Sequence, residues 1–342
     1  MNGLICMVKH KNMSNLKYEK VFNTLVDETE KYLKEHSIQA MVLGISGGID
    51  STVTATICFE VNKRTGIPLI GRSLPINNKD DEFNTSKLVG EAFCNDFKVL
   101  KIGGLYWNTL SDLCEDVGDI SAGDFSTIRC LEEMPSRTPI ANGNLQARLR
   151  MIYLYDLASR NKGIVISTDN QTEYQLGFWT LHGDVGDFNP LFGLWKTEVY
   201  ALANWLSKYY IGKTELATYP SQQSIKYHEM YEAINASAAL TPTDGLGISN
   251  SDLEQIGAKS YSEVDDILQE FEAFQYLYPK RLAGMTLKER AKEFLDNQEM
   301  LYIEPEVIVK VIDRHVKSEF KRKNLPICIT RDKYEYREEN NH

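Results

Sequence analysis

The chain has 342 residues, enough for one large domain or for one domain with a modest appendage. Its 42% hydrophobic and 25% charged residues are close to the average of soluble globular proteins, which excludes disordered, collagen-like and coiled-coil chains. The formal net charge of -10 argues against nucleic acid as a main partner. No apolar run is long enough to span a bilayer or to act as a secretory signal, so we expect a soluble cytoplasmic protein without a membrane partner.

Six cysteines are scattered along the chain, with no Cys-x-x-Cys pair and no Cys/His cluster at zinc spacing. Free cysteine usually behaves as a small buried hydrophobe, so we interpret these residues as reduced core thiols and nominate none as a nucleophile. They are Cys6, Cys58, Cys94, Cys114, Cys130 and Cys328.

Apolar runs and helical segments alternate along the first half of the chain. The first run, AMVLGI, ends in a Gly/Ser cluster and therefore predicts a buried strand that leads into a turn. The segment DDEFNTSKLVGEAFCND opens with acids suited to a helix N-terminus, and NLQARLRMIYLYDLASRNKG is amphipathic and closes with a glycine. Strands are predicted at 40–45, 67–75, 97–102 and 163–168, and helices at about 51–64, 80–96 and 144–163.

This alternation predicts an α/β fold, with right-handed βαβ units and a doubly wound parallel sheet flanked by helices. In such sheets, ligands bind beyond the carboxyl ends of the strands. We therefore expect a site among the residues that follow Ile45, Ser73 and Ser167.

Beyond about Leu240 the chain becomes charged and helix-rich, and strand signals are absent until a short tail. No internal repeat or low-complexity linker divides it. We predict a single domain over 1–342, with an α/β core at about 18–210 and a lid loop plus a helical C-terminal part at about 211–342. The lid is expected around TYPSQQS, where Ser, Gln and Lys are frequent.

The strongest local signal is SGGIDS at 46–51, between a predicted strand and a predicted helix. Two glycines let the backbone turn tightly, and the helix N-terminal amides can cradle a pyrophosphate together with the hydroxyls of Ser46 and Ser51. Asp50 would repel phosphate unless a cation lay between them, so it implies Mg²⁺. Walker A and Gly-x-Gly-x-x-Gly motifs are absent, which leaves the SGGxDS form typical of the ATP pyrophosphatase superfamily.

Longer segments resemble NAD synthetases, and the resemblance extends from about Tyr18 to Pro326. It is carried by GISGGIDS, GNLQARLRM, STDNQTEYQLGF and HGDVGDFNPLFGLWKTEV, at 44–51, 143–151, 167–178 and 182–199. These motifs occur in the family's order, and each lies at the end of a predicted strand or on the expected helix. The resemblance implies an adenine nucleotide α-hydrolase-like fold and a homodimer.

The resemblance implies a reaction in two steps. The nicotinate carboxylate of deamido-NAD attacks the α-phosphorus of ATP and expels pyrophosphate, and ammonia then converts the acyl-adenylate into NAD and AMP. It also implies that Asp50 and Glu173 hold Mg²⁺ and that Lys196 neutralises charge on the pyrophosphate. These three residues form the predicted catalytic set, with Mg²⁺ as cofactor and ATP as co-substrate.

Two sets of contacts follow from the same resemblance. Arg148 and Arg150 lie two apart on one helix and cannot share a face, which leaves one of them open to a merely solvated role. Asp187 is equally open to the role of a turn-forming residue. The implied ATP contacts are Gly44, Ile45, Ser46, Gly47, Gly48, Ile49, Asp50, Ser51, Arg72, Thr168, Lys196 and Ser221. The implied deamido-NAD contacts are Asn144, Arg148, Arg150, Asp184, Asp187 and Lys321.

Two positions depart from the family pattern. Leu181 stands where many relatives have a lysine associated with deamido-NAD, and Phe320 replaces a histidine that precedes Lys321. Either other residues bind the dinucleotide, which we favour, or the substrate differs from deamido-NAD where the lysine would have reached.

Other functions stay open on sequence grounds. The chain could be another adenylating ATP pyrophosphatase, such as a tRNA-modifying enzyme. A tRNA-binding enzyme would be expected to have a basic stripe or an added RNA-binding domain, and the acidic net charge of this chain argues against that. A catalytically silent nucleotide-binding regulator fits poorly with the retained Asp50, Glu173 and Lys196. Only about forty residues precede the first predicted strand, too few for an amidase domain, so we expect free ammonia as the nitrogen donor unless a separate chain supplies it.

Overall fold

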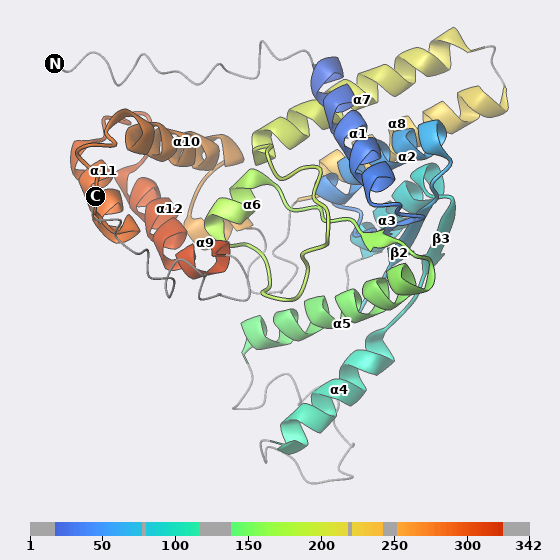
Figure 1. The fold of residues 1–342 in the computed structure, drawn as a ribbon, viewed down its shortest axis with the longest axis horizontal. Coiled ribbons are helices and arrows are strands. Elements are labelled where there is room, and N and C mark those ends of the chain that lie inside the picture. The colour runs from blue at the N-terminus through green and yellow to red at the C-terminus, as the bar shows by residue number, and fades with distance from the viewer. Residues whose placement is uncertain (1–17, 77–79, 117–137, 218–220, 242–251, 324–342) are drawn as a thin grey trace, which may run out of the picture.

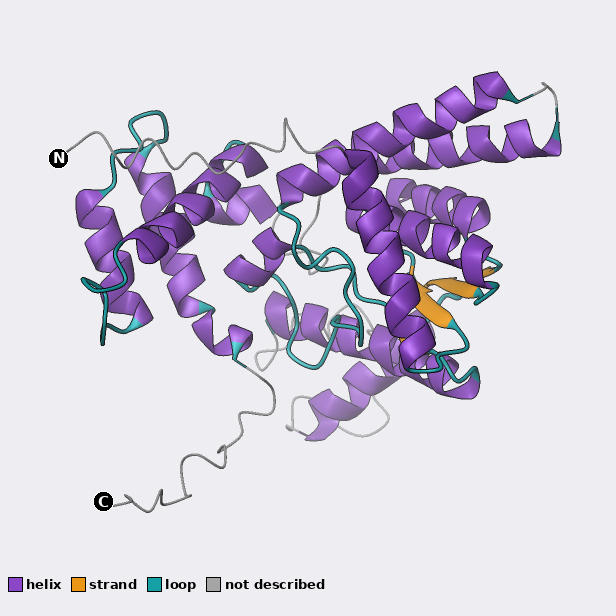
Figure 2. Ribbon diagram, turned by 45° about the horizontal axis from the view of Figure 1, so that its top comes forward, coloured by secondary structure: helices purple, strands orange, loops and turns teal. Residues whose placement is uncertain are grey.

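The computed structural model describes residues 18–76, 80–116, 138–217, 221–241 and 252–323 (Figure 1). Helices dominate, and the strands are confined to one small sheet (Figure 2). None of the described helices is long and apolar enough to cross a membrane. The strands are β1 (Met41–Gly44), β2 (Leu69–Ser73), β3 (Asp96–Val99) and β4 (Ile164–Val165). The helices are α1 (Tyr18–Glu35), α2 (Ile49–Thr65), α3 (Asp80–Phe93), α4 (Gly103–Asp116), α5 (Pro139–Arg160), α6 (Gln171–Leu176), α7 (Lys196–Leu216), α8 (Gln222–Ala239), α9 (Asp252–Ile256), α10 (Tyr261–Leu277), α11 (Leu287–Asn297), α12 (Pro305–Lys317) and the 3-10 helix η4 (Glu319–Arg322).

The sheet is parallel and has the strand order β3-β2-β1-β4, which confirms the predicted doubly wound arrangement. The chain leaves β1 for β2 on one side and later returns to β4 on the other, so the strand order reverses beside β1. A ligand crevice is expected at such a reversal. Beyond β4, Ile166 forms a parallel bridge with Phe188, which ties the following loop to the edge of the sheet.

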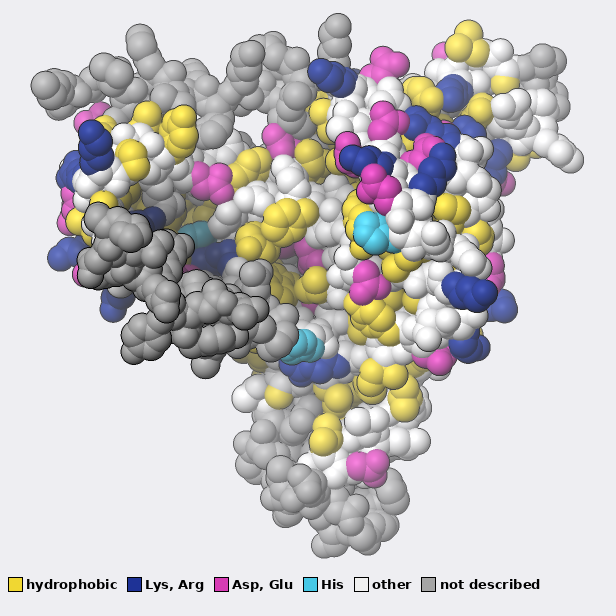
Figure 3. Space-filling view, in the orientation of Figure 1, with side chains coloured by type: hydrophobic (Ala, Val, Ile, Leu, Met, Phe, Trp, Pro, Cys, Tyr) yellow, Lys and Arg dark blue, Asp and Glu magenta, His cyan; other side chains and the backbone are white. Residues whose placement is uncertain are grey.

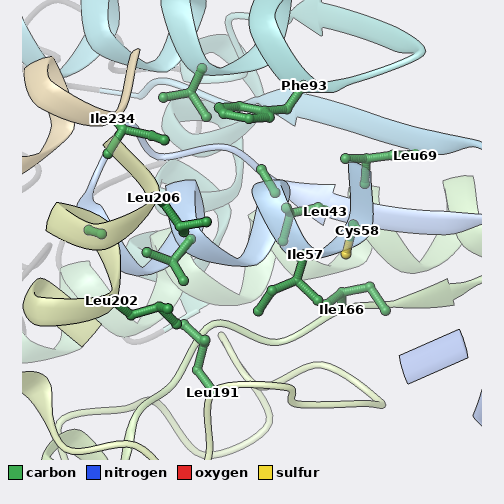
Figure 4. Packing of buried hydrophobic residues seen from close by; sticks show 14 of the residues in the cluster. Leu43, Ile57, Cys58, Leu69, Phe93, Ile166, Leu191, Leu202, Leu206 and Ile234 are labelled. Carbon is green, nitrogen blue, oxygen red and sulfur yellow. The ribbon is translucent and has the colours of Figure 1, made fainter. Parts of the chain in front are cut away.

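Side chains of β1 alternate between two buried faces of the sheet. Met41 and Leu43 pack in the larger core with helices α1, α2, α3, α7 and α8, part of which Figure 4 shows. Val42 packs on the opposite face with Leu154 and Leu157 of α5. The sheet is therefore the middle of three layers, and only its strand ends are left for a site.

The C-terminal helices build a second core. Phe271 of α10, Phe294 of α11 and Ile308 of α12 pack together, and Leu176 at the end of α6 joins them. Because α6 also carries residues of the predicted site, this second core abuts the strand ends of the first.

Helices α7 and α8 form a hairpin that spans the boundary predicted near residue 210, and both helices belong to the first core. The hairpin packs on α2 and α3, because Leu206, Met230 and Ile234 belong to the first core. Of the segment predicted as a lid loop, residues 218–220 lie outside the described part of the chain, and α8 begins at Gln222. The helical part with its own core begins only after this hairpin.

Two predicted core thiols lie within the described residues. Cys58 is buried and Cys94 is partly buried, and both are free. Burial raises the pKa of Cys94 to about 12, so its thiol is protonated at neutral pH. The side chain of Cys114 and the residues Cys6, Cys130 and Cys328 lie outside the described part of the chain.

Candidate active site

A cavity of about 350 Å³ lies at the carboxyl ends of β1, β2 and β4, where the sheet topology predicts a ligand. Its wall includes the β1–α2 loop, the end of β2 and the first turns of α6 and α7. Ser46, Asp50, Thr168, Glu173 and Lys196 all line it. The fold thus brings these distant predicted residues to one place.

The β1–α2 loop requires glycine at position 47. Gly47 has a φ of +89°, in the left-handed region that favours glycine. A Cβ at this position would lie 2.7 Å from Ser86 N and 2.8 Å from Glu82 O, which are backbone atoms of α3. The loop therefore packs against α3 with no room for a side chain.

Hydroxyl groups hold the rest of this loop. Ser46 Oγ accepts from Gly48 N at 3.2 Å, and Ser51 Oγ donates to Gly48 O at 2.9 Å. Helix α2 then begins without a side-chain cap. Its first amides are a suitable binding site for an anionic group in the cavity.

Lys196 lies between the two carboxylates predicted to bind metal. Its Nζ is 2.5 Å from Asp50 Oδ2 and 2.9 Å from Glu173 Oε1, and the residue is 2% exposed. Burial alone would lower the pKa of Lys196, but the two carboxylates raise it well above its ordinary value, so the ammonium stays charged. Burial raises the pKa of Glu173. The Lys196 ammonium lowers this pKa, but Glu173 shares the ammonium with Asp50, so the rise is only partly offset.

Asn170 connects the same two carboxylates and was not among the predicted residues. Its Nδ2 donates to Asp50 Oδ1 at 2.9 Å, and its Oδ1 accepts from Glu173 N at 3.0 Å as the cap of α6. Glu173 Oε2 accepts from the Asn170 amide in return, which completes a capping box. The Asn-x-x-Glu spacing in DNQTEYQL was the available sequence signal.

The donors in this cluster suit Mg²⁺. One oxygen of Asp50 and one of Glu173 meet at the same ammonium nitrogen, so the two carboxylates converge on one point. Within the described residues, no group of three or more His, Cys, Asp or Glu side chains is arranged to hold a metal. Mg²⁺ is commonly bound by two carboxylates, with phosphate oxygens and water at its remaining coordination positions.

Arg72 combines a cavity position with a structural ion pair. It lines the cavity at the end of β2, but its Nη2 lies 2.7 Å from Asp96 Oδ2 of β3. Its Nη1 donates to Gly71 O at 2.7 Å. The guanidinium therefore joins two strands, and an adenosine contact would have to use another part of the side chain.

Ser221 is not among the residues that line the cavity, and its ATP contact stays a prediction. It caps α8, where its Oγ accepts from Ser224 N at 3.1 Å. The 18-residue α8 is roughly 27 Å long, and its opposite end leads to Leu240 and Thr241, which line the cavity. Thr241, which was not among the predicted residues, places a hydroxyl group in the cavity wall.

Arg150 and Asp184, two of the predicted deamido-NAD contacts, line the same cavity. Arg150 projects from α5, and its Nε donates to Leu74 O at 3.2 Å. Asp184 is exposed to solvent, but the surrounding protein removes part of the hydration of its carboxyl, and this desolvation raises its pKa. The amide of Thr180 and the cations Lys321 and Arg150 oppose this rise.

Asp187 and Asn144 are not among the residues of the cavity wall, and both bond to other protein groups. Asp187 accepts from Tyr155 Oη at 3.0 Å and from Val165 N at 2.9 Å, so its carboxylate joins α5 to β4. Asn144 Oδ1 accepts from Thr180 Oγ1 at 2.8 Å. These contacts support the structural role that the sequence left open for Asp187.

Arg148 and Lys321 also contact backbone carbonyls. Arg148 Nη2 donates to Leu181 O at 3.1 Å, and the residue is exposed. Lys321 Nζ donates to Gly177 O at 2.6 Å and to Trp179 O. Both cations thus brace the loop after α6, next to the cavity rather than in its wall.

The fold and this site define an α/β protein built on a doubly wound sheet, with a glycine-rich loop and two acids around a buried lysine at the carboxyl ends of the strands. The model of a family described as NAD synthase matches residues 21–325. The chain therefore belongs to the NAD synthase family.

Several relatives carry related names. An NH(3)-dependent NAD(+) synthetase from Campylobacter jejuni subsp. jejuni is 29% identical over 191 residues, which cover 56% of this chain and 68% of that protein. One from Methanosarcina acetivorans is 29% identical over 257 residues, covering 75% and 83%. One from Methanocaldococcus jannaschii is 33% identical over 190 residues, covering 55% and 66%.

Solved structures share the fold. An NMN synthetase from Francisella tularensis superposes with a TM-score of 0.62 at 22% identity, covering 91% of this chain and 98% of that one. An NH3-dependent NAD synthetase from Campylobacter jejuni superposes with a TM-score of 0.57 at 22% identity, covering 92% and 99%.

Proposed function

We propose that this protein is an ammonia-dependent NAD synthetase, which adenylates the nicotinate carboxylate of deamido-NAD and then converts it to the amide. The observation that carries the proposal is the buried cluster of Lys196, Asp50 and Glu173, in a cavity that also contains Arg150. Family membership and the names of the relatives support this substrate and nitrogen donor.

In the first step, the pyrophosphate of ATP lies against the β1–α2 loop, where the start of α2 offers amides and Ser46 and Ser51 offer hydroxyls. A nicotinate carboxylate oxygen attacks the α-phosphorus, and the bond from that phosphorus to the β-phosphate oxygen breaks. Lys196 holds its positive charge beside the departing pyrophosphate and stabilises the charge that develops there. Arg150 orients the dinucleotide from α5.

Asp50 and Glu173 are the residues that would hold Mg²⁺ in this site, and Asn170 fixes the directions of both carboxylates. When bound, the ion supplies neutralisation of the ATP phosphates.

In the second step, ammonia attacks the carbonyl carbon of the acyl-adenylate. The bond from this carbon to the AMP phosphate oxygen breaks, and the nitrogen loses a proton to leave the amide. Adenylation is needed because a free carboxylate has no competent leaving group.

A homodimer belongs to the same proposal. Figure 3 shows apolar side chains over α4 and α5, on the side of the molecule that carries the sheet's smaller core. Five large apolar residues on these two helices have exposed fractions between 40% and 63%. They are Ile140, Ile152 and Tyr155 of α5 and Leu105 and Leu113 of α4. Such a patch is typical of an interface between copies of a chain.

Nicotinate mononucleotide is a second candidate substrate, favoured by Leu181. This position lacks the lysine that many relatives place near the dinucleotide, and a leucine supplies neither charge nor hydrogen bond. The Francisella protein, whose name indicates a mononucleotide product, shares the fold.

Turnover of purified protein tests both candidates. The protein is supplied with ATP, Mg²⁺ and either deamido-NAD or nicotinate mononucleotide, with ammonium or with ammonia-free glutamine. We expect AMP and NAD from deamido-NAD with ammonium, and no product with glutamine. Amide formed only from the mononucleotide would select the second candidate, and equal rates with glutamine would overturn the nitrogen donor.

A further inference from the structure

Asp265 is a buried carboxylate of the C-terminal core that reaches both helices of the catalytic cluster. It lies on α10 and is 1% exposed. Its Oδ1 accepts from Thr172 Oγ1 on α6 at 2.5 Å. Its Oδ2 accepts from the amide of Thr197 at 3.0 Å and from Thr197 Oγ1 at 2.7 Å, both on α7. Figure 1 shows α10 beside α6 and the start of α7.

These contacts fix the first turn of α7. Thr172 Oγ1, which donates to Asp265, also accepts from the amide of Lys196 at 2.8 Å. The amides of Lys196 and Thr197, the first two of α7, are therefore satisfied by Thr172 and Asp265. A negative charge at a helix N-terminus is favourable, and three donors offset much of the cost of burying the carboxylate.

The same helix starts carry the catalytic charges. Lys196 is the first residue of α7, and Glu173 follows Thr172 in the first turn of α6. Asp265 thus holds the backbone from which each side chain extends. Catalytic groups lose much of their effect when they are displaced by about 1 Å, so the backbone position of Lys196 matters for the chemistry.

We infer that Asp265 is a positioning residue: it couples the C-terminal helices to the reaction by fixing the place of Lys196. The inference rests on the proposed function for the reaction that Lys196 serves. It gives the C-terminal helices a role beyond that of a wall beside the site.

The test uses Asp265→Asn, with Asp266→Asn as the matched control. The asparagine keeps the shape of Asp265 but turns an N–H group toward a donor, so the start of α7 shifts. We expect kcat to fall about 10- to 100-fold, with a much smaller change in the KM for ATP. Asp266, on the same turn, is partly exposed, and its variant should keep kcat within about twofold.

A double-mutant cycle separates positioning from general support of the fold. In a Lys196→Ala background, Asp265→Asn should cost little further rate, because the group that it positions is gone. If the kcat losses of Asp265→Asn and Lys196→Ala multiply in the double variant, the inference is wrong. An unchanged kcat in Asp265→Asn would also overturn it. If Asp265→Asn does not fold, Thr172→Val, which removes the hydroxyl between Asp265 and the Lys196 amide, is put through the same cycle.

Failure of the proposed function has a different signature. Wild-type protein would then turn over neither nicotinate nucleotide. Calorimetric binding of ATP with Mg²⁺ still reports the coupling in that case. We expect Asp265→Asn to weaken ATP binding slightly, in line with the small change in KM, in the wild-type background and not in Lys196→Ala. Equal weakening in both backgrounds would contradict the inference.

Discussion

Lys196 determines how substitutions in the site act, because one buried ammonium serves two carboxylates. Removing either carboxylate leaves Lys196 paired with the other, so neither change strands a buried charge. Removing Lys196 instead leaves Asp50 and Glu173 facing each other. Loss of a carboxylate should therefore affect the chemistry more than the fold.

We expect Asp50→Asn and Glu173→Gln each to lower kcat by about 10² to 10³, as the loss of a group that stabilises transition-state charge typically does. Steady-state AMP release at saturating Mg²⁺ measures this. Thermal unfolding should show both variants folded, and Glu91→Gln on the exposed face of α3 is the control. Near-wild-type rates would mean that the metal site lies elsewhere.

Leu181 allows a test of the dinucleotide contact. Its backbone oxygen accepts from Arg148, so a new side chain leaves that contact in place. If other residues bind deamido-NAD, Leu181→Lys should change the KM for deamido-NAD by less than about tenfold, equivalent to about 1.4 kcal/mol. Wild type that ignores deamido-NAD, with a lysine variant that accepts it, would show that the substrate is different.

At the level of elements, the strand positions and the turn between β1 and α2 followed from local sequence, whereas the helical hairpin of α7 and α8 did not. Apolar runs bounded by Gly and Ser identify β1 and the first half of β2, since strands buried on both faces are rich in apolar residues. Polar residues in α8 concealed its packing on α2 and α3. Asp265 was missed because its partners Thr172 and Thr197 are distant in sequence, and no local pattern reports such contacts. The Asn-x-x-Glu spacing indicates Asn170 as a helix cap, but not its contact with Asp50, 120 residues away.

The β1–α2 loop gives an element-scale prediction. Gly47→Ala places a methyl group against the backbone of α3 at a positive φ, so we expect a loss of about 1–3 kcal/mol in unfolding free energy. The KM for ATP should rise, because the loop amides shift. Denaturant unfolding and initial rates measure both effects.

Gly212→Ala is the matched control. A Cβ at Gly212, inside α7, meets no atom within 4 Å. An alanine in a helix is favoured over glycine by roughly 0.5–1 kcal/mol, so this variant should be as stable as wild type or more so. Equal stability of the Gly47 and Gly212 variants would mean that the loop tolerates a side chain.

At the scale of the whole molecule, α6 joins the two cores. Leu176 at its end packs among the C-terminal helices, while its first turn carries Glu173 in the cavity. His315 of α12 strengthens this junction, because its Nδ1 donates to Gln175 O at 3.0 Å. Changes in the C-terminal helices should therefore reach the active site through α6.

The junction predicts how stability depends on pH. Burial and then Arg322 lower the pKa of His315 to about 4, whereas an unfolded histidine titrates near about 6.5. Between these values the unfolded chain binds the proton and the folded chain does not, so this residue's contribution is present above about pH 6.5 and is lost as pH falls toward 4. From pH 7 to pH 5 it should remove about 2 kcal/mol of unfolding free energy.

Buried acids change the pH profile of the whole protein in the opposite direction, because burial raises the pKa of Asp265 to about 6, and its protonation at low pH favours the folded state. The measurement is therefore a difference, taken by denaturant unfolding of wild type and His315→Asn at both pH values. Asparagine keeps a donor for Gln175 O but does not titrate, so its smaller size costs the same free energy at each pH. The difference in unfolding free energy between wild type and His315→Asn should be smaller by about 2 kcal/mol at pH 5 than at pH 7. A gap independent of pH would show that His315 titrates normally and that α12 does not hold it buried at the junction.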